Sequence, residues 1–587
     1  MEYVLRQQVL EGLEQGLEAA AGVSRLHTLL SLAWHLRQRD SRRAETLLAE
    51  FRRWLPRHRL PLAEANAVMA RAALVACETA CLFGRMADAQ AELDQARNHL
   101  RPSVDAHASG DAFLAEALLA KLSGDREREV HALESALACF AQSSDRQRWG
   151  IAAGMLACDR GTSHASPGPV PQEEVDSCNA AEQAFALAAQ AFPLCLRQPA
   201  EAAQLFNRSA ALALDMGLLR FHCIMSMNAS NACLALGDME ASAQCFEAPA
   251  HRARQTGWPL LMGMTQTQVG RVLRHLGRHQ ESLAALNEAL LQMRGLPQGQ
   301  GKAFACSELA FTLHALGQVR ESVDVMWEAI QLFRAGCAMA NLAMTLARQA
   351  HALAQLGQID ASMVALQEAQ ALSERFGCPL VDVEISGALA ELHRRGAQNL
   401  PAPAGMTAPT ATIHYAESAL DRGRLIRGWR PPAALLDYLA DACAEADQMR
   451  QAYAYSRQAR LAHVQDGGGR LRNPRALLQV LGVQMATKPQ DTGPPAAQAV
   501  AAARAAPPVP LLPSAPSQQM DLLTRKEQAV LQLLARNYSN KEIAQAMGVG
   551  AETVKWHLKG MFSKLEACSR KHAVTRARTL GMLQYPD

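Results

Sequence analysis

The side chains that could form functional contacts, judged by residue type and spacing, lie near the C-terminus. Lys555, Trp556 and Lys559 fall on the polar side of a helical pattern whose apolar side carries Val554 and Leu558. A lysine ammonium can donate hydrogen bonds to guanine O6 and N7 or to a phosphate, and an exposed tryptophan can pack on a thymine methyl or a sugar. This pattern predicts a helix surface that could contact DNA.

Sequence signals for helix N-termini indicate where the neighbouring helices begin. T-x-x-E at Thr524 and S-x-x-E at Ser539 are capping-box patterns, and each opens an amphipathic run. Gly548-Val549-Gly550 then breaks the chain in a tight turn. Two short helices joined by such a turn form a helix-turn-helix, whose second helix enters the major groove. The predicted helices after the first run over 541–547, 551–565 and 570–580.

The string LTRKEQAVLQLLARNYSNKEIAQAMGVGAETVKWHLKGMFSKLEACSRKHAV resembles the DNA-binding domain of LuxR/NarL-type regulators over nearly its whole length. LT-x-x-E, SNKEIA, TVK-x-H and KL-x(4)-R occur in the family's order. The resemblance implies a four-helix domain that binds double-stranded promoter DNA as a homodimer, with the fourth helix at the dimer contact. It also implies base contacts from Lys555, Trp556 and Lys559, and phosphate contacts from Lys541, Thr553, His557, Lys564 and Arg570.

Some of these positions have a second interpretation. Trp556 could pack on a neighbouring domain, His557 could be structural, and Lys564 could lie on a solvated face. Gly550 stands where the family usually has a serine that caps the recognition helix. Because a glycine N-cap costs only about a few tenths of a kcal/mol relative to serine, we expect slight fraying there and no loss of function.

A second pattern covers most of the remaining chain. The dipeptide Leu-Gly recurs at a constant spacing, at 236, 276, 316 and 356, and Phe83-Gly84 and Ser123-Gly124 show the same step earlier. Helical patterns with apolar residues at i, i+3, i+4 and i+7 precede and follow each dipeptide. A glycine at the end of a helix fits the left-handed C′ position. Each unit of about 40 residues is therefore predicted to be a helix, a tight turn and an antiparallel helix.

One such hairpin cannot bury its apolar face, so neighbouring hairpins must stack into a solenoid. The array resembles the tetratricopeptide repeat (TPR) family in a longer-period form found in the sensor arrays of some bacterial regulators. It departs from that family in its period, which is usually 34, and in lacking the consensus Trp and Tyr. The composition, 49% hydrophobic, 20% charged and 5% aromatic, excludes a mainly disordered chain. The predicted fold class is all-α.

Breaks rich in Pro, Gly, Ser or Ala divide the array and separate it from the C-terminal domain. The last break is a semi-extended Pro/Ala-rich linker. The predicted organisation is helical repeats over 1–158, a loop over 159–174, TPR-like repeats over 175–398, a break over 399–412, a helical hairpin or cap over 413–486, the linker over 487–519 and the LuxR-type domain over 520–587.

No catalytic or cofactor motif stands out. The stretch GLPQGQGKA (295–303) resembles a P-loop, but Gly295 and Gly301 are six apart where the motif requires five. Ala303 replaces the hydroxyl that binds Mg²⁺, and the stretch follows a helical pattern instead of a strand. The whole arrangement resembles the large ATP-binding LuxR-type (maltose-activator-like) regulators without their N-terminal P-loop NTPase domain. We therefore expect no enzymatic activity and no cofactor or metal.

Fourteen cysteines are scattered, with no C-x-x-C pair and no Cys/His cluster at zinc spacing, which is typical of a reducing compartment. The N-terminus carries charges where a signal peptide needs an apolar run. The most apolar stretch, 184–196, is shorter than the roughly 20 residues of a membrane helix. We expect a cytoplasmic bacterial protein that makes no membrane contact.

Charge is unevenly distributed. The chain carries +3, but the segment from 521 onward holds eleven basic and six acidic side chains, a net charge of +5, which leaves −2 on the rest of the chain. A basic C-terminal domain suits phosphate contacts, and an acidic array does not. We expect a transcriptional regulator, by family default an activator that contacts RNA polymerase, whose array senses a small-molecule or protein effector. The alternatives are an interaction scaffold with vestigial DNA binding and an NTP-dependent switch.

Overall fold

The structure is a computed structural model that describes residues 2–100, 105–162, 180–397 and 400–464, together with 525–535, 538, 540–547, 554, 558, 570, 573, 574 and 577. It divides into two compact units, Met1–Thr487 and Lys488–Asp587, which are treated separately below. All regular structure in the described residues is helical, so the chain is all-α as its sequence predicts.

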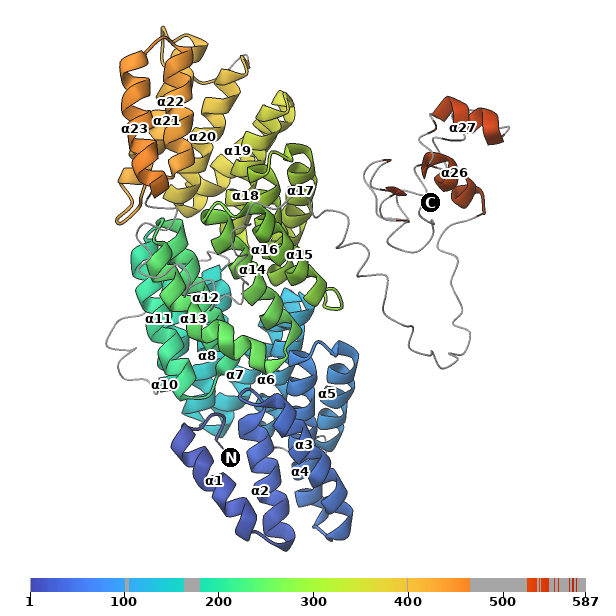
Figure 1. The fold of residues 1–587 in the computed structure, drawn as a ribbon. Helices are drawn as coiled ribbons and strands as arrows, with labels where there is room; N and C mark the ends of the chain where they lie inside the picture. The colour runs from blue at the N-terminus through green and yellow to red at the C-terminus, as the bar shows by residue number, and fades with distance from the viewer. Residues whose placement is uncertain are drawn as a thin grey trace, which may run out of the picture. The chain divides into compact units, whose positions relative to one another are not determined.

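The first part of the repeat unit consists of helices that pair in chain order (Figure 1). Short 3-10 turns, η1 (Leu55–Arg57) and η2 (Phe192–Leu194), interrupt the series. The helices are α1 (Gln7–Ala19), α2 (Gly22–Leu36), α3 (Ser41–Trp54), α4 (Leu62–Leu82), α5 (Met86–Leu100), α6 (Ala106–Ser123), α7 (Arg126–Ser143), α8 (Arg146–Thr162), α10 (Ala180–Ala191) and α11 (Pro199–Asp215).

From Leu219 onward the period of the sequence becomes a structural period. The first helix of four of these hairpins begins at Leu219, Pro259, Met339 or Pro379. These starts are 40 residues, or twice 40 residues, apart. The helices are α12 (Leu219–Ala235), α13 (Met239–Thr256), α14 (Pro259–His275), α15 (His279–Gln292), α16 (Gln300–Ala315), α17 (Val319–Ala335), α18 (Met339–Gln355), α19 (Ile359–Phe376), α20 (Pro379–Arg394), α21 (Ala408–Arg424), α22 (Ala433–Glu445) and α23 (Met449–Val464).

The glycine of each Leu-Gly dipeptide ends the first helix of its hairpin in the left-handed conformation. Gly317 and Gly357 have φ of 78° and 72°. The amide that follows each glycine donates to a carbonyl five residues back, Gln318 N to Leu313 O at 2.9 Å and Gln358 N to Leu353 O at 3.0 Å. This is the 6→1 bond of a Schellman motif, so the predicted C′ role of the glycine is confirmed.

A buried serine ties the two helices together in three successive hairpins. Ser282, Ser322 and Ser362 lie one repeat period apart near the start of α15, α17 and α19, and all have 0% exposure. Each hydroxyl donates to a carbonyl of the preceding helix, 12 residues back, at 2.6 to 2.7 Å. Because the hydroxyl is satisfied, burial of a polar group at the centre of the hairpin carries little penalty.

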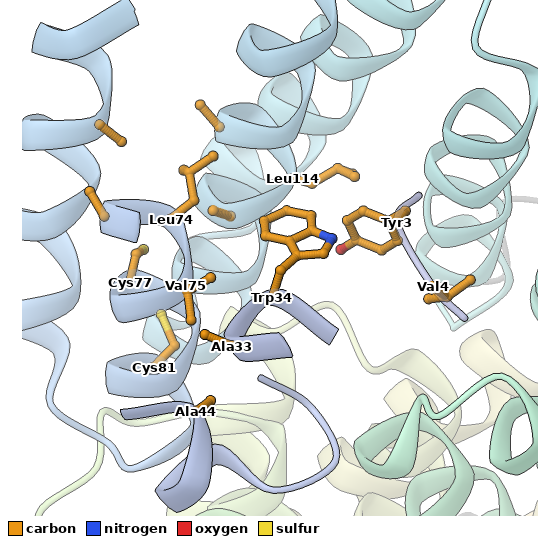
Figure 2. Packing of buried hydrophobic residues seen from close by; sticks show 14 of the residues in the cluster. Tyr3, Val4, Ala33, Trp34, Ala44, Leu74, Val75, Cys77, Cys81 and Leu114 are labelled. Atoms are coloured by element: carbon orange, nitrogen blue, oxygen red, sulfur yellow. The ribbon is translucent and has the colours of Figure 1, made fainter. Parts of the chain in front are cut away.

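The N-terminal hairpins bury the largest aromatic core of the unit. Figure 2 shows Trp34 of α2 beside Tyr3, Leu74 and Leu114, and the rings of Trp34 and Tyr3 meet edge to face at 5.9 Å. The Trp34 indole N–H donates to the carbonyl of Glu2 at 2.9 Å. Full burial of an aromatic ring with its N–H paired is the favourable way to place tryptophan in a core.

The stacked hairpins wind far enough for distant repeats to touch. Trp258 Nε1 donates to Ser41 Oγ at 3.2 Å across 217 residues of sequence, and Arg197 Nε donates to the carbonyl of Phe376 at 2.8 Å across 179 residues. Arg430 pairs with Asp238 across 192 residues. Contacts between hairpins that are far apart in the sequence therefore close the superhelix of this unit on itself.

Two predicted boundaries differ from the structure. The loop predicted over 159–174 begins later, because α8 continues to Thr162, where Arg126 pairs with Asp159 at 2.9 Å and holds that turn against α7. The break predicted over 399–412 ends at Thr407, whose side chain forms a capping box with Thr410 at the start of α21. The remainder of the first loop and the linker over 487–519 lie outside the described residues.

Helix α4 is the one helix in the described residues that is long and apolar enough to cross a membrane by length and composition, whereas the stretch predicted to be the most apolar was 184–196. In the structure 67% of its apolar window is buried inside the unit. Its buried side chains include Leu74, Val75 and Cys77, which pack in the core around Trp34. This helix therefore serves as a core helix of the array.

Candidate nucleic-acid interface and repeat cavity

The C-terminal unit is built on a small core to which four segments contribute. Its helices α26 (Arg525–Ala535) and α27 (Asn540–Met547) start directly after Thr524 and Ser539, the two positions predicted as N-caps. The buried side chains from these two helices and from two later segments are Val530, Leu531, Leu534, Ile543, Ala544, Val554, Leu558, Ala573 and Ala577. Val554 and Leu558 are helical and lie one turn apart, as predicted for the apolar side of the third helix.

Arg570 connects the last segment of this unit to the turn between α26 and α27. Its guanidinium donates to the backbone carbonyl of Tyr538, and the Tyr538 amide in turn donates to Leu533 O at 3.3 Å. A charged donor on a backbone carbonyl is a strong form of hydrogen bond. The phosphate contact of Arg570 stays a prediction, and in the structure this residue holds Tyr538, two positions before the start of α27.

The other predicted DNA contacts have no described side chains. Lys541 lies in the first turn of α27, but only its backbone is described. The remaining predicted contacts lie outside the described residues: Thr553, Lys555, Trp556, His557, Lys559 and Lys564. Their roles stay predictions.

The repeat unit encloses a cavity of about 640 Å³, which is within the range of sites for small organic ligands. Its wall is formed largely by the first helices of successive hairpins. Equivalent positions of successive repeats face it together: Ile224, Met264, Phe304, Met344 and Glu384 form one row, and Asn228, Gln268, Glu308 and Arg348 form the next. The constant repeat period therefore places side chains of matching register around one cavity.

A network of charges lies on one part of this wall. Glu308 accepts a hydrogen bond from Arg274 at 2.6 Å and lies 3.3 Å from Arg271, while Arg348 pairs with Glu384 at 2.8 Å. Burial alone would raise the pKa of Glu308, but the neighbouring Arg271 and Arg274 outweigh burial and lower it. The carboxylate is therefore held ionised by three arginines that together carry more charge than the two acids.

The stretch that resembles a P-loop also lies at this cavity. Its first residues form the turn between α15 and α16, and Gly301 and Lys302 already belong to the first turn of α16. The Lys302 ammonium donates to the carbonyl of Leu296, which holds the turn, and burial lowers the pKa of Lys302. The predicted loop between repeats therefore covers only 295–299, because 300–303 form the first turn of α16.

The sequence prediction named no ligand-contacting residue in the array. A signal was present, because the wall positions recur with the period of the hairpins within otherwise apolar helices, and at one of them Asn228, Gln268, Glu308 and Arg348 are all polar. Periodicity alone does not tell which polar face points inward, since a polar stripe on a helix more often faces solvent. These positions face the cavity because the superhelix closes on itself.

Comparison with known proteins locates similarity in the C-terminal segment. Residues 521–577 match the family described as bacterial regulatory proteins, luxR family. The HTH-type transcriptional regulator AlkS of Alcanivorax borkumensis is 41% identical over 61 residues, which are 10% of this chain and 7% of that protein. The response regulator protein VraR of Staphylococcus aureus is 41% identical over 64 residues, which are 11% of this chain and 31% of that protein. The chain thus spans less than a third of the length of either relative.

Solved structures align with this chain at low similarity. Aspartyl phosphate phosphatase F from Bacillus subtilis aligns with 73% of this chain and 98% of its own, with 10% identity and a TM-score of 0.34. A Rap protein complexed with competence and sporulation factor aligns with 70% of this chain and 100% of its own, with 14% identity and a TM-score of 0.31.

The family match, the ordered motifs and the four-segment core fall on the same residues. The predicted helix starts at Thr524 and Ser539 agree with the observed starts of α26 and α27. Residues 521–577 therefore match the luxR family of bacterial regulatory proteins, in the segment whose motifs predict a helix-turn-helix domain.

Proposed function

We propose that this protein is a one-component transcriptional regulator, in which the repeat unit at 1–486 senses an effector and controls promoter binding by the domain at 520–587. The observation that carries the proposal is the luxR-family match over 521–577 at the end of a chain whose other unit is a helical array with an internal cavity. The protein acts in the cytoplasm, binds double-stranded DNA as a homodimer, contacts RNA polymerase to activate transcription and catalyses no reaction.

The division of labour follows from charge. The residues from 521 onward carry a net charge of +5 and the rest of the chain carries −2. Binding to the phosphate backbone releases counterions and depends on local positive charge, so the C-terminal domain makes the DNA contacts and the array does not. The predicted linker over 487–519 tethers the two and leaves the DNA-binding domain able to pair with that of a second chain.

Binding of the full-length protein to genomic DNA fragments tests the proposal. We expect retarded fragments in a gel-shift assay at low salt, with a few promoters retained as salt rises. Lys541→Ala should weaken binding to all fragments and reduce the salt slope by about one, because a phosphate contact is lost. Lys555→Ala should cost about 1–3 kcal/mol on the preferred promoter and relax its sequence preference, because a base contact is lost.

Arg53→Ala is the control, because Arg53 lies on the exposed side of α3 in the repeat unit. It should leave DNA binding unchanged. If the full-length protein binds promoter and random fragments equally at all salt concentrations, the regulator proposal fails. A tightly held protein partner in that situation would favour the scaffold alternative.

A further inference from the structure

Within the described part of the chain, the cavity of the repeat unit contains one cation that stands apart from the others. Eight basic and four acidic side chains line it. Seven of the basic side chains have a partner within the described residues: Lys121 pairs with Glu129, Arg126 with Asp159, Arg271 and Arg274 with Glu308, Arg348 with Glu384, Arg430 with Asp238, and Lys302 donates to the carbonyl of Leu296. Among the described residues Arg220 has no ion-pair or hydrogen-bond partner.

Arg220 is placed in the cavity by the first turn of α12. Burial lowers the pKa of its guanidinium, and the more distant Glu129 and Cys81 offset that effect only in part. Because an arginine side chain stays protonated in proteins, the cavity holds an uncompensated positive charge. Arg220 is half-buried, and a cation withdrawn from solvent without a counterion costs free energy unless an anion pairs with it.

The lining of the cavity that holds Arg220 suits an organic anion better than a bare inorganic one. Ile224 lies one turn further along α12, and Met264 and Phe304 occupy the equivalent wall positions of α14 and α16. Apolar walls with a few placed polar groups are the usual form of a small-molecule site, and a guanidinium matches carboxylate, sulfonate and phosphate oxygens well. The volume of about 640 Å³ admits such a molecule and excludes a folded domain.

We propose that Arg220 binds the anionic group of a small organic acid whose apolar body lies against Ile224, Met264 and Phe304. This ligand is the effector of the regulator, so that part of the statement rests on the proposed function. The partnered arginines around Glu308 line another part of the same cavity, and Arg220 supplies the charge that selects anions over neutral molecules of the same shape.

Fluorescence titration of the full-length protein with two matched probes tests the proposal. 8-Anilinonaphthalene-1-sulfonate carries an anionic group, and N-phenyl-1-naphthylamine has the same ring system without it. Arg220→Gln should weaken binding of the sulfonate about 10- to 100-fold, as expected for a charged hydrogen bond, and change binding of the amine less than twofold. Arg208→Gln, on the exposed side of α11, is the matched control and should change neither.

The thermal unfolding midpoint separates a ligand role from a structural one. Removal of an unpaired, half-buried charge should leave the midpoint of the ligand-free protein unchanged or raise it. A lower midpoint for Arg220→Gln would show that the residue stabilises the fold, and would overturn the proposal. Unchanged binding of the sulfonate, or equal weakening of both probes, would overturn it as well.

The two proposals fail separately. The titration contains no DNA and the gel shift contains no probe. A protein that shifts promoter DNA but binds both probes alike refutes the anion site only. A protein in which Arg220→Gln selectively loses the sulfonate but which binds no promoter refutes the regulator function only.

Discussion

Trp34 shows how single residues stabilise the N-terminal part of the array. Two guanidinium groups lie close to its ring, with Arg37 at 3.7 Å and Arg71 at 4.3 Å from the ring centroid. Arg37 forms an ion pair with the buried carboxylate of Glu78, and Arg71 forms one with the buried carboxylate of Asp111. Stacking of guanidinium on tryptophan adds to the ion pairs, and full pairing is what makes burial of these charges tolerable.

Buried neutral histidines make stability depend on pH. Burial, followed by the charges of Arg37 and Arg39, lowers the pKa of His35 from 6.5 to about 3. Below about pH 6.5 the unfolded chain therefore binds a proton at His35, whereas the folded protein does not. The stability that His35 contributes is fully present above that pH and is lost as the pH falls from about 6.5 towards 3. The pKa values of His222, His275, His314 and His351 are also lowered, with burial as the leading cause.

We expect the free energy of unfolding, measured by urea denaturation, to fall between pH 7.5 and pH 5.5. His35→Gln should reduce that fall by about 1.4 kcal/mol, since one proton is no longer taken up on unfolding over the last pH unit. His131→Gln on the exposed side of α7 is the control and should leave the pH dependence as in the parent protein. A parent protein equally stable at both pH values would contradict the explanation.

At the scale of elements, the hairpin is stabilised by a small set of features that recur once per repeat. The left-handed glycine stops the first helix, the amide after it closes the Schellman motif, and the buried serine ties the second helix to the first. Each feature is local, so one repeat forms in the same way as the next. Stacking against neighbours then supplies the burial that a single hairpin lacks.

Two glycine substitutions distinguish the backbone strain that an added Cβ causes from its steric clashes. Gly317 has φ of +78° and Gly387 lies in the body of α20, and an added Cβ would meet no atom within 4 Å at either. Gly317→Ala should therefore destabilise the protein by about 1–2 kcal/mol, because alanine is strained in that conformation. Gly387→Ala should be neutral or stabilise by about 0.5–1 kcal/mol, because alanine favours a helix interior. Thermal unfolding measures both, and equal effects would refute the assignment.

At the scale of the whole repeat unit, contacts between distant hairpins change how the array should unfold. An open solenoid has only nearest-neighbour interfaces and can lose repeats one at a time. Here Trp258 is 2% exposed and bonded to Ser41, and Leu82 of α4 packs in the same cluster as Trp258 and Leu261. The N-terminal and central hairpins should therefore unfold together.

Trp258→Ala should break this coupling. We expect a loss of about 3–5 kcal/mol from the cavity left by the indole, and a single calorimetric transition should split into two. Trp327→Ala is the matched control, because Trp327 of α17 is 56% exposed, and it should cost no more than about 0.5 kcal/mol. Splitting in both variants, or in neither, would contradict the closed-superhelix interpretation.

The repeat and the C-terminal domain could be predicted from the sequence, because both depend on local patterns. The Leu-Gly spacing specifies a helix, a left-handed stop and a returning helix, and each step involves residues a few positions apart. The capping boxes at Thr524 and Ser539 mark helix starts in the same local way. The two loop boundaries were misjudged by a few residues, since Ser-, Gly- and Pro-rich composition does not show where a helix stops when a side chain such as Asp159 is paired within it.

Which faces of the repeats line the cavity depends on contacts between hairpins that are far apart in the sequence. The superhelix closes through pairs such as Ser41 with Trp258 and Arg197 with Phe376, whose partners are 217 and 179 residues apart. No local pattern encodes such a pair, because its formation depends on the small rotation that each hairpin adds to the last. That accumulated rotation encloses the cavity and leaves Arg220 inside it without a counterion among the described residues.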